Sequence, residues 1–237
     1  MRKVALFLSA IFLTVMIVSF TSNSSNESGS SIDEVTIGNQ VWMAENLNVD
    51  TFRNGDPIPH SKTEEEWDEA DANGLAAWCY YENNPINGVK YGKLYNWHAV
   101  NDPRGLAPKG WHIPSDEEWT NLVYSLSNED PESLDIYGNS VGIKMKDKKG
   151  WKRYKPERKS TRRKEQKRES KATNESGFSA LPGGVCEGGF FEFSGIGYFG
   201  NWWSSSESSW SLSFNSRLLS IEDGDSWVSQ SVRCVRD

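Results

Sequence analysis

Tryptophan constrains the fold of this chain more than any other feature of its sequence. Eleven tryptophans stand among 237 residues, and aromatic residues together make up 12% of the chain. Each aromatic side chain buries roughly 150–250 Å² when it packs in an interior. We therefore expect a core that is built largely from rings. The mean hydropathy of -0.66 indicates that the chain as a whole is not a membrane protein.

The first residues of the chain differ from the rest. A basic start at Arg2 and Lys3 is followed by Val4–Phe20, which carry no charge, and then by small polar residues. This order is the layout of a secretory signal peptide, which we predict at residues 1–21. The alternative is an uncleaved anchor, because a run of this length is near the lower limit for crossing a bilayer. Serine, asparagine and glycine dominate residues 22–33, which predicts a disordered linker.

Helical patterns lie in the middle of the chain. Ser115 stands three residues before Glu118, which is the spacing of a capping box at a helix start. The apolar residues behind it recur at helical spacing and predict one buried stripe, formed by Trp119, Leu122, Val123 and Leu126. Shorter helices are predicted over residues 63–70 and 92–99.

Strand-like patterns dominate the last third of the chain. The turn pair Gly38-Asn39 already predicts a tight hairpin near the start. Short runs with strand character then follow between glycine-rich or acidic turns, at residues 178–181, 202–204, 209–214, 217–221 and 227–235. Helices early and antiparallel strands late predict an α+β domain over residues 34–237, with two or three short helices and a mainly antiparallel, irregular sheet.

One segment carries a concentrated positive charge. Residues 144–171 hold 15 lysines and arginines against 4 acidic residues, whereas the whole chain has a net charge of -7. Such a run repels itself and predicts a solvated insertion loop. The functional alternative is contact with a polyanion, such as anionic lipid headgroups, acidic polysaccharide or DNA. The candidate residues for that contact are Lys152, Arg153, Arg162, Arg163 and Lys164.

Cysteine and histidine show no catalytic or metal-binding pattern. The spacings of Cys79, Cys186 and Cys234 match neither a metal knuckle nor a CxxC redox motif. In an exported protein two of them can pair and leave one free, and the spacing does not select which two. Reactive thiols need an accessible, electropositive setting, which these sequence contexts do not indicate. We predict no catalytic residue, no metal and no cofactor.

Aromatic residues among small polar ones suggest a recognition surface. Residues 198–214 combine six aromatic rings with serine, glycine and asparagine, a composition that suits binding because rings offer contact area at low entropy cost. At least one of Trp202 and Trp203 is expected in the core. Trp210, Phe214 and Trp227 are predicted to lie on an exposed surface and to contact a ligand.

Several blocks of the chain, in order from about residue 34 to 237, resemble the Fibrobacter succinogenes major paralogous domain. The resemblance implies a C-type-lectin-like fold related to the formylglycine-generating (sulfatase-modifying) enzymes, found in exported, often surface-attached bacterial proteins. Many members carry cysteine where this chain has Ala107, so the disulfide pattern stays open. The blocks are residues 37–47, 91–97, 108–115, 118–119, 174–184, 202–206 and 231–235.

These observations lead to three hypotheses about function. The first is a secreted or envelope-associated binding module, not an enzyme, that recognises a protein or a glycan at the bacterial cell exterior. The second is an enzyme-like protein related to the formylglycine-generating factors. The third is polyanion binding through residues 144–171. No specific nucleic acid is expected as a partner, and membrane contact is expected only through an uncleaved leader.

Overall fold

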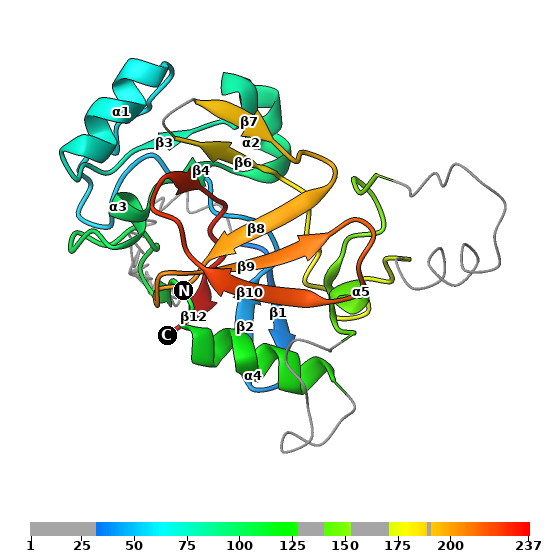
Figure 1. Ribbon diagram of the computed structural model, residues 1–237. Coiled ribbons are helices and arrows are strands. Elements are labelled where there is room, and N and C mark those ends of the chain that lie inside the picture. The colour runs from blue at the N-terminus through cyan, green and yellow to red at the C-terminus, as the bar shows by residue number, and fades with distance from the viewer. Residues whose placement is uncertain (1–31, 128–139, 153–170, 189–190) are drawn as a thin grey trace, which may run out of the picture. The chain divides into compact units, whose positions relative to one another are not determined.

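The computed structural model describes residues 32–127, 140–152, 171–188 and 191–237 (Figure 1). The predicted signal peptide and most of the predicted linker lie outside these ranges, so both remain predictions. The described residues form short helices and mainly antiparallel sheets, which is the predicted α+β class. None of the helices in these ranges combines the length and hydrophobicity that a bilayer crossing requires.

The helices and strands are short. The helical elements are α1 (Glu64–Ala72), a 3₁₀ turn η1 (Tyr81–Asn83), α2 (Pro85–Tyr91), α3 (Trp97–Val100), α4 (Asp116–Leu126) and α5 (Gly142–Met145). The strands are β1 (Glu34–Ile37), β2 (Gln40–Met43), β3 (Trp78–Cys79), β4 (Leu94–Tyr95), β5 (Trp111–His112), β6 (Val185–Glu187), β7 (Glu192–Ser194), β8 (Phe199–Trp203), β9 (Ser208–Ser213), β10 (Leu219–Asp223), β11 (Val228–Ser229) and β12 (Val235–Arg236).

Small sheets organise the domain. The first is a four-stranded sheet in the order β1-β2-β12-β5, so the last strand lies between two strands from the first half of the chain. Strands β10, β9 and β8 form the antiparallel sheet at the centre of Figure 1. The other two sheets are β11-β6-β7 and the pair β3-β4.

The two strongest local predictions are confirmed. Gly38-Asn39 joins β1 to β2 as a hairpin in which Ile37 pairs with Gln40, and Gly38 has a φ of 62° that favours glycine. Helix α4 begins after Ser115, whose Oγ accepts from the Glu118 amide at 3.3 Å while Glu118 Oε2 accepts from the Ser115 amide at 2.8 Å. Its predicted stripe is buried at Trp119, Leu122 and Val123.

Other predicted elements need correction. Residues 92–99 are not one helix: Gly92 ends α2 with a φ of 79°, β4 pairs with β3, and Asn96 then caps α3. The run 178–181 forms no strand and makes only an isolated bridge, between Ala180 and Lys146. By contrast, the predicted helix over 63–70 is confirmed as α1, with Thr63 as its N-cap.

The predicted basic loop 144–171 begins inside the fold. Lys144 lies in α5 and donates from Nζ to the Leu126 carbonyl at 2.7 Å. Lys146 is fully buried, donates to the carbonyls of Ser213 and Ser216, and has its pKa lowered to about 8 by burial. A charge count cannot distinguish such structural lysines from solvated ones, so the prediction placed the start of the loop too early.

Tryptophan forms the centre of the core, as expected. Trp42, Trp119 and Trp202 have no exposed surface, and the rings of Trp42 and Trp119 lie 4.9 Å apart. Both Trp202 and Trp203 are buried. Trp210 is 0% exposed as well, so the prediction that it lies on the surface is wrong. Its ring stacks on Trp119 at 5.6 Å, and its Nε1 donates to Asp116 Oδ1 at 2.8 Å.

The start of α4 is tied to the end of the chain through His112. The His112 Nε2 atom lies 2.7 Å from Glu118 Oε1, and its Nδ1 lies 2.9 Å from Asp237 Oδ1. Burial alone lowers the pKa of His112, but hydrogen bonds and charge from both carboxylates outweigh it, so the pKa is raised above 6.5. A protonated His112 therefore stabilises the folded state fully below pH 6.5, and this contribution is lost as pH rises through the raised pKa.

We expect this pH dependence to disappear in His112→Gln. Because the histidine side chain is 39% exposed, the contribution is small, under about 1 kcal/mol. Thermal unfolding of both proteins at about pH 6 and about pH 8 checks it, since this interval contains the ordinary titration range of histidine. Equal losses of stability in the two proteins over that interval would contradict the assignment.

Candidate functional site

The predicted aromatic ligand residues do not form a common surface. Trp210 belongs to the core, whereas Trp227 is 57% exposed and its carbonyl accepts from the Gly188 amide beyond β6. Phe214 is half-buried and packs edge-on against Tyr198 at 5.1 Å. Each of the three thus has different neighbours. Phe214 and Trp227 stay predictions as ligand contacts, without a shared site to support them.

Only one of the predicted polyanion residues lies in the described part of the chain. Lys152 is exposed, and its Nζ lies 5.8 Å from the centre of the Tyr198 ring. Arg153, Arg162, Arg163 and Lys164 lie outside the described residues. Polyanion binding therefore stays a prediction.

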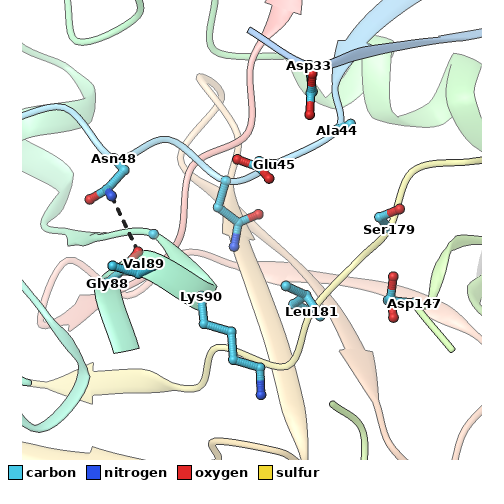
Figure 2. A pocket seen from close by; sticks show the side chains of 12 residues that line it. Asp33, Ala44, Glu45, Asn48, Gly88, Val89, Lys90, Asp147, Ser179 and Leu181 are labelled. Carbon is cyan, nitrogen blue, oxygen red and sulfur yellow. Dashed lines mark hydrogen bonds between the residues drawn. The ribbon is translucent and has the colours of Figure 1, made fainter. Parts of the chain in front are cut away.

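A polar cavity of about 320 Å³ provides a better candidate site. Figure 2 shows α2 on one side of it, with Val89 and Lys90, and Ser179, Leu181 and Asp147 on the opposite side. The segment that follows β2 borders it between these two sides. The complete lining is Asp33, Ala44, Glu45, Asn46, Asn48, Gly88, Val89, Lys90, Gly92, Asp147, Ser179 and Leu181.

Asn46 holds the floor of the cavity in place. Its Nδ2 donates to the Tyr91 carbonyl at 2.8 Å and to Ser231 Oγ at 3.2 Å. Its Oδ1 accepts from Trp202 Nε1 at 2.9 Å and from Arg233 Nε at 3.0 Å and Nη2 at 2.7 Å. One amide side chain thus connects α2, the central sheet and the segment before the last strand.

Arg233 places a buried positive charge behind this floor. The side chain is about 1% exposed, donates also to the Phe178 carbonyl and lies 4.3 Å above the Phe178 ring. Burial lowers the pKa of Arg233 to about 9, and the negative charge of Glu45 opposes this shift. The guanidinium is therefore still protonated at neutral pH, and Glu45 at the cavity is the carboxylate that acts on it.

The α2 wall is fixed by close backbone contacts. A Cβ at Gly92 would stand 2.7 Å from the Leu47 carbonyl oxygen. Only glycine therefore allows the end of α2 to lie this close to the segment that follows β2. Asn48 Nδ2 donates to the Gly88 carbonyl at 3.3 Å, and Lys93 Nζ donates to the Asn48 carbonyl at 3.0 Å. These contacts hold Val89 and Lys90 at the cavity rim.

The opposite wall is fixed by a turn around Ser179. Ser179 has a φ of 55°, and its amide donates to Asn174 Oδ1 at 2.8 Å while Asn174 Nδ2 donates to Ser179 Oγ at 2.9 Å. The amide of Asp147 donates to the Ala180 carbonyl at 2.9 Å. Two bonds to the Asn174 side chain thus fix the turn at Ser179, and the backbone bond to Ala180 holds Asp147 beside it.

The charges of the cavity favour a ligand that supplies hydrogen-bond donors. Asp33, Glu45 and Asp147 contribute three carboxylates against one ammonium, that of Lys90. Among the described residues, no group of three His, Cys, Asp or Glu side chains is arranged to hold a metal ion. Figure 2 shows the three carboxylates at different places around the cavity, where they suit separate groups of a larger ligand. Val89, which is 87% exposed, adds an apolar side chain to the α2 wall of the cavity.

Sequence reasoning did not identify this site. Glu45 and Asn46 lie in one block that carried the family resemblance and Ser179 lies in another, and only that signal pointed to them. The charged residues Asp33, Lys90 and Asp147 come from three other parts of the chain. These side chains come together only in the tertiary fold, and no local sequence pattern predicts that.

Comparison with known proteins finds a matching family model. The family model described as the Fibrobacter succinogenes major domain matches residues 35–236. No curated protein and no solved structure shows a significant match to the chain.

Proposed function

Because the chain belongs to the Fibrobacter succinogenes major domain family, whose match spans nearly all of the described residues, we propose that it is an exported binding module and not an enzyme. Its ligand is a protein or a glycan at the bacterial cell exterior. The single observation that carries this proposal is the 320 Å³ cavity with its excess of carboxylates. The fold that the family resemblance implies, a C-type-lectin-like domain, is part of the same proposal.

The cavity chemistry narrows the class of ligand. Carboxylates accept hydrogen bonds from sugar hydroxyls, from amino groups and from lysine or arginine side chains, and bonds to charged groups contribute about 1.5–3 kcal/mol each. A polyanion would be repelled by the excess negative charge of Asp33, Glu45 and Asp147. The exposed side chain of Val89 in the lining offers a surface for the non-polar face of a sugar or for an aliphatic side chain.

We expect a double variant, Glu45→Gln with Asp147→Asn, to weaken ligand binding at least about tenfold, because two charged acceptors are lost. The ligand is found first by screening the purified protein against arrayed cell-wall and host-cell glycans and against envelope proteins. Calorimetry with the best binder then compares the double variant with the wild type. Both substitutions preserve side-chain volume, and circular dichroism of the variant checks that the fold is intact, because removing the Glu45 charge that acts on Arg233 is itself expected to lower the melting temperature.

The matched control is Glu192→Gln, which removes an exposed carboxylate on β7 outside the cavity. Its affinity should equal that of the wild type. If the ligand bound the double variant, the control and the wild type with equal affinity, its site would lie outside the cavity. If the screen found no ligand at all, the binding function itself would be contradicted.

The accessibility of the cysteines counts against the enzyme-like alternative. Formylglycine-type chemistry requires an accessible, reactive thiol, and Cys79, Cys186 and Cys234 are all buried. Burial also raises the pKa of Cys79 and of Cys234, which disfavours the nucleophilic thiolate.

A further inference from the structure

The three cysteines occupy two separate parts of the core. Cys79 and Cys186 belong to one cluster, together with Trp67, Tyr81 and Leu94. Cys234 belongs to another cluster, which contains Trp111 and Ala107. All three are present as free thiols and none is exposed. Two cysteines that are 107 positions apart in the sequence are thus neighbours in space, while the third is apart from them.

Strand pairing and ring packing bring the surroundings of Cys79 and Cys186 together in this cluster. Cys186 pairs with Phe193 across β6 and β7, and the Phe193 ring lies 5.3 Å from the ring of Tyr81. Cys79 ends β3, and Tyr81, two residues later, begins η1. Cys79 and Cys186 lie in the same buried cluster, and the Cys186 thiol adds to the burial that raises the pKa of Cys79.

We propose that Cys79 and Cys186 close an intramolecular disulfide when the chain folds under oxidising conditions, and that Cys234 remains a thiol. The sulfur of one cysteine attacks a small disulfide, such as oxidised glutathione, and one glutathione thiol leaves. The second cysteine then attacks the mixed disulfide and releases the other glutathione thiol. Two protein thiols lose two protons and two electrons, and the small disulfide gains them.

The burial of the pair determines when this reaction takes place. Desolvation raises the pKa of Cys79, so the folded protein holds very little reactive thiolate at this position. Oxidation therefore takes place during folding, before the surrounding core closes. The proposal does not depend on what the cavity binds, and export matters only because it supplies an oxidising compartment.

Peptide mapping of the full-length wild type tests the pairing without any substitution. The chain is refolded from denaturant with reduced and oxidised glutathione, denatured again with N-ethylmaleimide and digested with trypsin without reduction. Lysine and arginine positions place Cys79 in peptide 63–90, Cys186 in peptide 172–217 and Cys234 in peptide 234–236. We expect peptides 63–90 and 172–217 as one linked species and the maleimide on peptide 234–236.

Variants supply an independent measurement. Reduction should lower the melting temperature of the wild type and of the control Cys234→Ala, because both form the disulfide. It should leave the melting temperature of the double variant Cys79→Ala with Cys186→Ala unchanged. A link that includes Cys234, or three maleimide-labelled cysteines after oxidative refolding, would overturn the proposal.

Discussion

Replacing Asn46 with alanine is expected to lower the free energy of unfolding by about 3–5 kcal/mol, although the substitution removes only a small side chain. Its Oδ1 accepts from Trp202 and twice from Arg233. A lost bond to a charged group costs about 1.5–3 kcal/mol, and an unsatisfied buried donor costs about 1–3 kcal/mol more. Arg233 would keep only its bond to the Phe178 carbonyl. Urea unfolding of the wild type and the variant measures the difference.

Asn48→Ala is the matched control for this prediction. It removes the same side chain two positions later, where the amide is exposed and makes one bond of 3.3 Å to the Gly88 carbonyl. We expect a loss below about 1 kcal/mol. Similar losses in the two variants would show that Asn46 does not connect the cavity floor to the core in the way described.

Trp210→Ala is expected to cost about 3–5 kcal/mol, the usual range for truncating a buried tryptophan. The side chain is 0% exposed, stacks on Trp119 and donates to Asp116. Its removal leaves a cavity between α4 and the central sheet and removes the N–H donor that bonds to Asp116 at the start of that helix. Thermal and urea unfolding should both show the loss.

Trp227→Ala provides the comparison, since it removes the same side chain from a position that is 57% exposed. Surface substitutions of this kind change stability by about 0.5 kcal/mol or less. If Trp227→Ala were the more destabilising of the two, the assignment of Trp210 to the core and Trp227 to the surface would be wrong.

The features that could be predicted from the sequence are local ones. The hairpin at Gly38-Asn39 and the capped start of α4 depend on residues within four positions of one another, so their signals are complete in a short window. The prediction of one helix over 92–99 was wrong because Gly92 ends α2 and Asn96 is the N-cap of α3. Their stop and cap roles became clear only from φ at Gly92 and from the bond that Asn96 Oδ1 accepts from Ala99.

Trp210 shows a different kind of error. Its small polar neighbours suggested an exposed surface, yet Trp210 and Leu212 alternate with Ser211 and Ser213 along β9. Alternate residues of a strand point to opposite faces, so this pattern already placed both large side chains on one buried face. The cavity could not be found in this way, because Asp33, Lys90 and Asp147 approach one another only after the sheets have assembled.

The position of β12 has a consequence for how this protein is made. Strand β12 pairs with β2 and β5, and Arg233, just before it, bonds to Asn46. A ribosome must therefore synthesise residues 233–236 before the first sheet can be completed. Until those residues are present, β2 and β5 lack the strand that lies between them, and Asn46 lacks its guanidinium partner.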